Sequence, residues 1–250
     1  MFELYHAPFS TCSQKVRLCL AEKGIDYVSH LVDLSRQEHL LPQYLELNPN
    51  GVVPTLVHGA SVIVDSSVIC EYLDEVVPEP RLSPATAAGR AGMRSWMRYF
   101  EEVPTAAIRV PSFNGLFAKA FARMPDDQFE AMTESMPLRR SFYRKMRETE
   151  EGFDQATFDE SIESLARTLE RVDASLDPGP WILGEQFTVA DIVLVPTIVR
   201  MDDIGLAHMW ANYPRVSGWY RRVQERRSFD IAYFDGSRVS LPSDNHSQKG

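Results

Sequence analysis

The step from Val53 into Pro54, followed by the apolar residues Thr55-Leu56-Val57, restricts this chain to few local structures. A proline at the first residue of a strand has no amide to give to the sheet, and a cis bond before it turns the preceding N–H and C=O outward. A second apolar run ends nine residues after Leu56 in Asp65 and Ser66, which are typical of a helix start. The pattern predicts a sheet edge that binds an extended peptide.

The residues at the predicted helix start indicate the kind of peptide. Free amides and the positive end of the helix dipole attract a carboxylate, so Ser66 and these amides suit the carboxylate of a γ-glutamyl group. Asp65 suits the ammonium of the same group. Glutathione carries both groups, and we expect it to be the peptide. The alternative is a turn proline followed by an ordinary helix N-cap, and these residues alone favour that alternative.

Charge and cysteine content narrow the class of protein. The 250 residues have a formal net charge of −9, and binding to nucleic acid requires a basic face that the sequence does not provide. The three cysteines form neither an even set nor a pair spaced for a metal, and no signal peptide or apolar run of membrane length is present. We expect a cytoplasmic protein with no metal and neither nucleic acid nor membrane as a partner.

Hydrophobic periodicity predicts a small α/β unit at the N-terminus. Residues 2–6 and 27–34 are expected to be strands, and Ser13–Lys23 a helix closed by Gly24. A hairpin across Gly59-Ala60 and a helix over Ser67–Val76 follow. This order predicts a mixed sheet with flanking helices.

The pattern breaks at a proline-rich stretch and is helical beyond it. We expect a domain over residues 1–78, a linker over 79–88, an all-helical domain over 89–235, and a polar, poorly ordered tail over 236–250. Thr188 and Asp191 have the spacing of a helix capping box, whose role is in folding.

These motifs, in this order, resemble the glutathione S-transferase family. The resemblance rests on Leu4-Tyr5, the segment from Ser10 to Arg17, Asn48-Pro49-Asn50-Gly51-Val52-Val53-Pro54, Asp65-Ser66 and the capping box, and it spans about residues 1–230. It implies a thioredoxin-like N-terminal domain with βαβαββα order and a mixed four-stranded sheet, followed by an all-α domain. It also implies glutathione as co-substrate, an active site in the cleft and a homodimer.

By this resemblance Ser10 matches the catalytic hydroxyl of serine-type transferases. A hydroxyl at a helix N-terminus donates a hydrogen bond to the glutathione sulfur and favours the thiolate, which is the nucleophile. Thr11 and Ser13 are alternatives, because a one-residue change of loop register would present either of them. Cys12 lies where the family often carries a cysteine beside the serine. If Cys12 were the nucleophile, the enzyme would be a glutathione-dependent thiol–disulfide reductase or a glutathione lyase.

The predicted glutathione-binding residues are His39, Val52, Val53, Pro54, Asp65 and Ser66. His39 matches a histidine that binds the glycyl carboxylate in theta-type enzymes. Val52 departs from those enzymes, which carry a basic residue there, and this puts the strength of carboxylate binding in doubt. Gln43 and Lys15 are alternatives for that task.

The segment between Trp96 and Phe153 is long for a transferase and contains many aromatic and arginine residues. It is similar to a segment of the bacterial β-etherases and related fungal transferases, which implies attack of the glutathione thiolate on a hydrophobic, aromatic electrophile with cleavage of a β-aryl ether. An aromatic pocket suits such substrates, although each ring taken singly fits a helical core better. A third hypothesis is a non-catalytic ligand-binding protein with the same fold.

Overall fold

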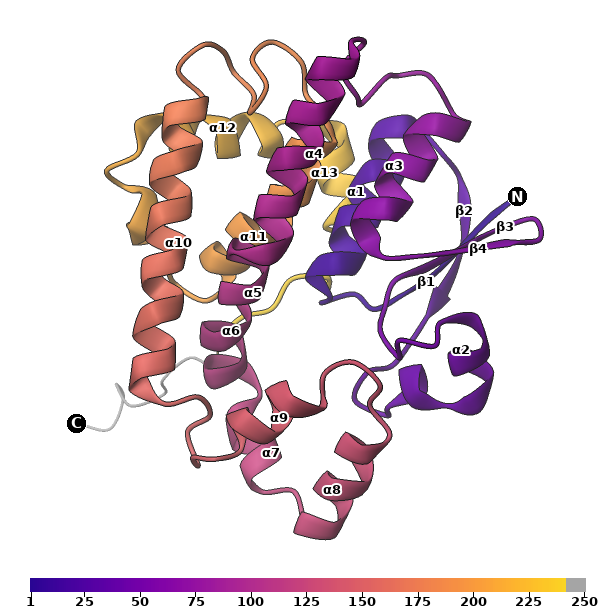
Figure 1. The fold of residues 1–250 in the computed structure, drawn as a ribbon, viewed down its shortest axis with the longest axis vertical. Helices are drawn as coiled ribbons and strands as arrows, with labels where there is room; N and C mark the ends of the chain where they lie inside the picture. Colours follow the sequence, from indigo (N-terminus) through magenta and orange to yellow (C-terminus); the bar gives the residue numbers. More distant parts are fainter. Residues whose placement is uncertain (242–250) are drawn as a thin grey trace.

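A four-stranded sheet forms the centre of the N-terminal part of the chain (Figure 1). The computed structural model describes residues 1–241. The strands are β1 (Phe2–His6), β2 (Tyr27–Leu31), β3 (Thr55–His58) and β4 (Ser61–Val64). β1 pairs in parallel with β2 and antiparallel with β3, and β3 pairs antiparallel with β4, so the strand order is β2-β1-β3-β4. The mixed four-stranded sheet predicted from the sequence is confirmed.

Helices connect and cover these strands. They are α1 (Thr11–Lys23), the 3₁₀ turn η1 (Glu38–Leu40), α2 (Pro42–Leu47) and α3 (Ser66–Val76), which gives the expected βαβαββα order. Strand β2 is shorter than the expected 27–34, because the Asp33 carboxylate accepts a hydrogen bond from the Ser35 amide at 2.8 Å and turns the chain. Gly24 ends α1 at φ 63°, in the left-handed region that glycine adopts without a steric cost.

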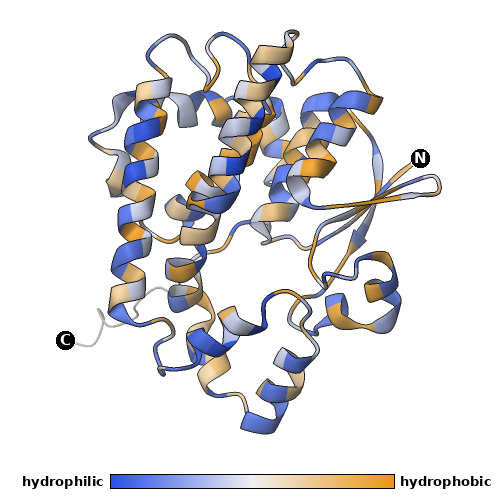
Figure 2. Cartoon of the chain, in the orientation of Figure 1, coloured by the Kyte–Doolittle hydropathy of each residue, from blue (hydrophilic) through white to orange (hydrophobic). Residues whose placement is uncertain are grey.

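The rest of the described chain is helical. The elements are α4 (Ala87–Glu102), α5 (Pro104–Ala107), α6 (Arg109–Leu116), α7 (Ala118–Ala122), α8 (Asp126–Glu134), α9 (Arg140–Met146), α10 (Gln155–Ser175), α11 (Val189–Asp203), η2 (Ala207–Trp210), α12 (Pro214–Gln224) and α13 (Arg227–Ala232). In Figure 2 the outer helix α10 carries hydrophilic and hydrophobic residues in alternation along its length, as expected for a helix that packs through one face. No helix within residues 1–241 is both long and apolar enough to cross a membrane.

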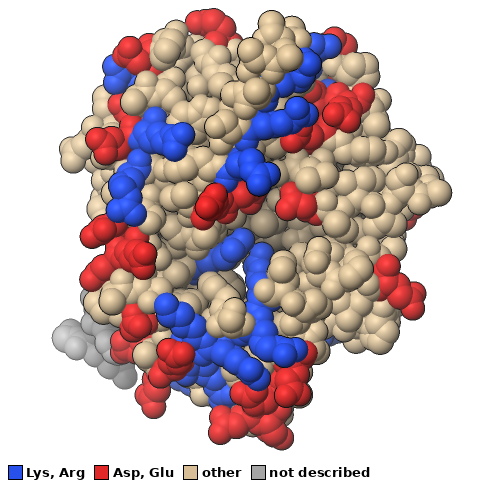
Figure 3. Space-filling model, viewed as in Figure 1, with Lys and Arg blue, Asp and Glu red and all other residues tan. Residues whose placement is uncertain are grey.

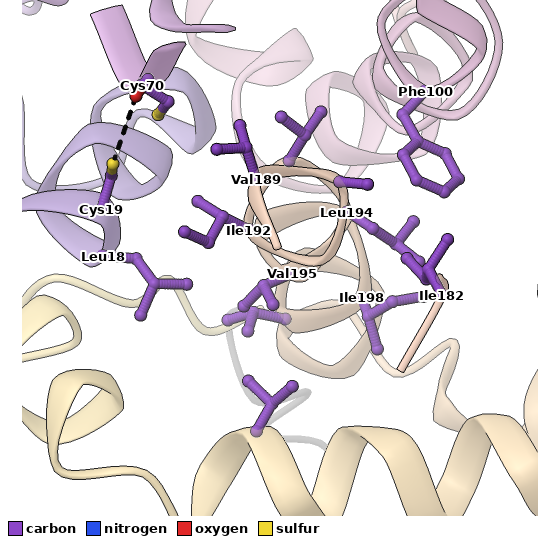
Figure 4. Close-up of a cluster of buried hydrophobic side chains, with 14 of the residues drawn as sticks. Leu18, Cys19, Cys70, Phe100, Ile182, Val189, Ile192, Leu194, Val195 and Ile198 are labelled. Carbon is purple, nitrogen blue, oxygen red and sulfur yellow. Dashed lines mark hydrogen bonds between the residues drawn. The ribbon is translucent and has the colours of Figure 1, made fainter. Parts of the chain in front are cut away.

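Helix α11 lies at the centre of the main hydrophobic core. Side chains radiate from it in several directions, among them Val189, Ile192 and Ile198, and all three are buried (Figure 4). They pack with Leu18 and Cys19 of α1, Phe100 of α4 and Ile182 in one cluster of buried side chains. One core therefore joins the sheet part to the helical part. Burial on all sides explains why this helix is mostly apolar from Val189 to Val199.

The predicted capping box starts α11. The Thr188 amide donates to the Asp191 carboxylate at 2.9 Å. The same carboxylate accepts from the Ile182 amide at 3.1 Å and from Trp219 Nε1 at 2.9 Å. Asp191 therefore joins three segments inside the core rather than only capping one helix.

The expectation of poor order after Gly236 is wrong for residues 236–241. Ser237 is buried, and its carbonyl accepts a hydrogen bond from Gln14 Nε2 at 2.9 Å. Arg238 forms an ion pair with Asp202 at 2.9 Å and also contacts Asp203. These partners are distant in the sequence, so the polar composition of the segment could not reveal them. The remainder of the expected tail, residues 242–250, lies outside the described residues.

Candidate active site

The loop from Ala7 to Ser10 joins β1 to α1 and carries the predicted catalytic hydroxyl. Two buried arginines hold its backbone: Arg17 of α1 donates to the carbonyls of Ala7 at 3.3 Å and Pro8 at 2.9 Å, and Arg200 of α11 donates to the Phe9 carbonyl at 2.5 Å. Arg17 also donates to the Ala232 carbonyl at 3.0 Å. The loop is therefore fixed from three elements, and the start of α1 is presented in one position.

The polar residues at the start of α1 differ in orientation. Ser10 is the half-buried N-cap, and its oxygen accepts a hydrogen bond from the Ser13 amide at 3.2 Å, which leaves its hydroxyl hydrogen free to donate. Ser13 is fully buried, and its oxygen accepts from the Ala7 amide at 3.3 Å. Thr11 and Cys12 are half-buried. The geometry places Ser13 inside the fold, whereas the other three reach the surface at the helix N-terminus.

A partly buried ion pair lies directly behind this helix start, with Lys15 buried and Glu101 half-buried. Lys15 of α1 and Ser67 of α3 both donate to the Glu101 carboxylate of α4. Burial alone would lower the pKa of Lys15, but the neighbouring Cys12 and Glu101 outweigh burial and raise it. Burial acts to raise the pKa of Glu101, but Lys15 and the Ser67 hydroxyl hold it below its usual range. Both groups of the pair are therefore charged near neutral pH, and they connect the sheet part to the helical part.

The predicted peptide-binding edge is built around a cis Val53–Pro54 bond. Side chains hold the loop before it: the Tyr44 hydroxyl donates to the Val52 carbonyl at 2.8 Å, and Asn48 Nδ2 donates to the same carbonyl at 2.9 Å. Val53 lies outside the strand ladder, and its amide has no hydrogen-bond partner among residues 1–241. Val53 is buried, and its unpaired amide is a candidate contact for a ligand.

Asp65 and Ser66 stand at the start of α3, as predicted. Asp65 has φ 72°, a left-handed conformation that is unusual for a residue other than glycine and costs roughly 1–3 kcal/mol. Its carboxylate accepts from the amides of Ser67 at 2.9 Å and Val68 at 3.1 Å, so Asp65 is the N-cap of the helix. Ser66 is buried beside it. The predicted cap is present, and it occupies one oxygen of the carboxylate expected to bind an ammonium.

His39 is half-buried in η1, where its Nδ1 atom is buried without a hydrogen-bond partner among the described residues. Burial lowers the pKa of His39, and Arg139 lowers it further. The imidazole is therefore neutral at pH 7, and a neutral imidazole donates only one hydrogen bond.

Three charged residues near the site were not predicted from the sequence. Glu101 had no signal, because its partners Lys15 and Ser67 lie 86 and 34 residues away. Arg109 and Arg139 belong to the aromatic and arginine-rich segment. The composition of this segment is visible in the sequence, but its position relative to the start of α1 is not. No cluster of three or more His, Cys, Asp or Glu side chains that could hold a metal ion is found in residues 1–241.

Comparison with known proteins agrees with this architecture. A model of the glutathione S-transferase N-terminal domain matches residues 9–76, and a model of the C-terminal domain matches residues 155–222. A protein of Arabidopsis thaliana, glutathione S-transferase TCHQD, is 30% identical over 247 residues, which cover 94% of this chain and 92% of that protein. The chain belongs to the glutathione S-transferase family.

Two further relatives of this transferase come from Sphingobium. Protein LigF of Sphingobium sp. is 31% identical over 184 residues, which cover 72% of this chain and 71% of that protein. The crystal structure of the β-etherase LigF superimposes with a TM-score of 0.83 at 27% identity, covering 93% of this chain and 98% of LigF. The tetrachloro-p-hydroquinone reductive dehalogenase of Sphingobium chlorophenolicum is 28% identical, covering 92% of this chain and 94% of that protein. The predicted thioredoxin-like domain followed by a helical domain is confirmed.

Proposed function

We propose that this glutathione transferase activates the glutathione thiol through the Ser10 hydroxyl and transfers the sulfur to a hydrophobic aromatic electrophile. The observation that carries the proposal is the position of Ser10, an N-cap with a free hydroxyl hydrogen on a loop clamped by two buried arginines. A donor and a helix N-terminus aimed at one sulfur both favour the thiolate over the thiol. The free Val53 amide and the residues Asp65 and Ser66 supply contacts for the peptide.

An aromatic acceptor is supported by the helical part and by the relatives. Phe113, Phe121 and Phe142 surround Tyr143 with ring-centroid distances of 5.6, 5.3 and 5.7 Å and form an aromatic cluster with it. Aromatic side chains recognise aryl groups by burial and edge-to-face contact. Two relatives are a β-etherase and a tetrachloro-p-hydroquinone reductive dehalogenase, and the hydroquinone of the second is an aromatic ring.

Ether cleavage is the sharper form of this proposal. The thiolate sulfur attacks the carbon that bears the aryl-ether oxygen, a C–S bond forms, and the C–O bond breaks. The oxygen leaves as a phenolate with the bonding electron pair, and the thiol proton passes to solvent. The products are a glutathione thioether and a phenol, with no net oxidation or reduction.

The second candidate function uses Cys12 for thiol–disulfide exchange. It is favoured by the partly accessible Cys12 thiol and by the positive groups of Lys15 and Arg109 close to it. Cys19 and Cys70 are buried, with Cys19 Sγ directed to the Cys70 carbonyl at 3.7 Å, and they do not compete for this role.

The two candidates are separated by substituting Ser10 and Cys12 in turn. Wild type, Ser10→Ala and Cys12→Ser are incubated with glutathione and a chlorodinitroaryl electrophile, a β-aryl ether or a glutathione mixed disulfide, and products are followed by mass spectrometry. Thioether formation should fall at least tenfold in Ser10→Ala and persist in Cys12→Ser. Phenol release would identify etherase activity. If the enzyme reduces the disulfide and only Cys12→Ser loses this activity, the nucleophile is Cys12 and the serine mechanism is wrong.

We also propose a cytoplasmic homodimer with a role in detoxification or in aromatic-compound metabolism. Val62 of β4 and Val68 of α3 are 45% and 53% exposed, and exposed apolar side chains of this kind support a contact between subunits. Light scattering of the purified protein tests the dimer, since a monomer mass at micromolar concentration would contradict it.

A further inference from the structure

Arg109 and Arg139 differ from Arg144 and Arg147, two other arginines of the same segment. Arg109 opens α6 and Arg139 precedes α9, and both are half-buried. Their neighbours have carboxylate partners: Arg144 pairs with Glu130 at 2.6 Å, and Arg147 pairs with Asp126 at 2.9 Å. Within residues 1–241, neither Arg109 nor Arg139 has a carboxylate oxygen at ion-pair distance. Arg109 and Arg139 are therefore partly buried cations without a direct ion pair, and Glu101 compensates the charge of Arg109 only from beyond ion-pair distance.

The guanidinium groups of Arg109 and Arg139 lie close enough to repel each other, and Arg109 also lies beside Cys12 at the start of α1. Burial lowers the pKa of Arg109, and Arg139 lowers it further, whereas Cys12 and Glu101 act to raise it. Two positive charges in a partly desolvated site repel each other. A bound anion would offset this repulsion. Figure 3 shows Lys and Arg side chains bordering a hollow in the middle of the face that contains α6, α9 and the end of α1.

The same place carries aromatic side chains. Tyr143 of α9 lies near both arginines, which lower its pKa while burial raises it. Its ring is edge-on to Phe113 at 5.6 Å and to Phe121 at 5.3 Å. A ligand bound at this position would contact aromatic rings and the two guanidinium groups together.

We infer that Arg109 and Arg139 bind an anionic substituent, such as a carboxylate, on the aromatic acceptor. This inference rests on the proposed function and assigns the class of acceptor that the same site prefers. Guanidinium groups present paired donors that match a carboxylate, and hydrogen bonds between charged groups are stronger than neutral ones. The acceptor is thereby oriented with its ring against Tyr143 and its reacting carbon toward the glutathione sulfur.

The glycyl carboxylate of glutathione is the other source of the same chemistry. The charge of Arg139 lowers the pKa of His39, and His39 is the residue predicted to bind that carboxylate. The groups that act on the pKa of Arg109 are Arg139, Cys12 and Glu101. An experiment must therefore vary the charge of the acceptor and the charge of glutathione separately.

The acceptor arm compares 4-chloro-3-nitrobenzoate with the neutral 4-chloro-3-nitrobenzamide. In both, the thiolate sulfur replaces chloride on the ring, chloride leaves with the bonding electrons, and the thiol proton passes to solvent. Arg109→Gln and Arg139→Gln should each lower kcat/KM for the benzoate by about ten- to a hundredfold and for the benzamide by less than about threefold. The matched control is Arg144→Gln, which removes an exposed, already paired guanidinium from α9 and should leave both rates unchanged.

The glutathione arm compares glutathione with its glycyl ethyl ester, using the neutral benzamide. The inference predicts that neither substitution changes the ratio of KM for the two thiols by more than about twofold. If Arg139→Gln raises KM for glutathione but not for the ester, and the two acceptors respond equally, the pair binds glutathione and the inference is wrong.

Other outcomes are also decisive. If the wild type conjugates neither acceptor, the proposed function fails. If the variants lose kcat/KM equally for the benzoate and the benzamide, only the anion preference is overturned. Arg139→Lys keeps the charge but loses the paired donors, so it should retain only part of the benzoate selectivity. Should either glutamine variant fail to fold, inhibition of the wild type by benzoate relative to benzamide gives the same contrast, and equal inhibition would contradict the inference.

Discussion

Lys15 of α1 and Glu101 of α4 form an ion pair that connects the sheet part of the chain to the helical part next to the candidate site. The Lys15 side chain is 1% exposed, and its charge has Glu101 as its partner at ion-pair distance. The acid also accepts from Ser67, the residue after the buried Ser66. Removing one partner of such a pair leaves the other charge buried alone, which costs more than the pair contributes when it is intact.

We predict that Glu101→Gln lowers the free energy of unfolding by about 3 kcal/mol at pH 7. The pKa of Glu101 is lowered in the folded state, so its contribution is present above the usual Glu value of about 4.3 and is lost as pH falls through the lowered folded pKa. The pKa of Lys15 is raised, so its contribution is full below about 10.4 and is lost as pH rises through the folded pKa. Urea unfolding of wild type and variant tests this.

The matched control is Arg167→Gln, because Arg167 and Glu163 form an exposed pair at 3.4 Å on α10. Such a pair contributes less than about 1 kcal/mol. Equal losses in Glu101→Gln and Arg167→Gln at pH 7 would show that the buried pair has no special role.

Helix α11 shows what can be inferred about an element from its sequence. The spacing of Thr188 and Asp191 predicts the start of the helix, because a capping box is a local arrangement of adjacent residues. The contacts of Asp191 with Ile182 and Trp219 could not be predicted, since they depend on packing between elements. The same limit applies to Arg109 and Arg139, whose role depends on where α6 and α9 meet α1.

We predict that Asp191→Ala lowers the free energy of unfolding by about 3 kcal/mol or more, because three buried donors lose their acceptor. Asp154→Ala is the matched control: Asp154 is the exposed N-cap of α10 and accepts from the Thr157 amide at 2.7 Å, so its loss should cost about 1 kcal/mol. Urea unfolding measures both. Similar losses would mean that Asp191 acts only as a local cap.

At the scale of the whole molecule, the site is assembled from distant segments. The loop that carries Ser10 is held by Arg17 of α1 and Arg200 of α11, and Arg17 in turn donates to the carbonyl at the end of α13. The Phe234 ring packs under Arg17 at 5.1 Å. The order of elements along the N-terminal part, the proline edge and the N-cap are features that sequence patterns predict. The clamp on the loop and the closing C-terminal segment are not local, which is why the order of residues 236–241 was mispredicted.

The central claim is that Ser10 lowers the pKa of the bound glutathione thiol. Titration of the thiolate by its ultraviolet absorbance, with enzyme saturated by glutathione, measures that pKa directly in wild type, Ser10→Ala and Cys12→Ser. We predict a pKa about 2 below the free value of ~8.5 in wild type and Cys12→Ser, a difference of about 2.7 kcal/mol, and a return toward the free value in Ser10→Ala. An unchanged pKa in Ser10→Ala would contradict the account.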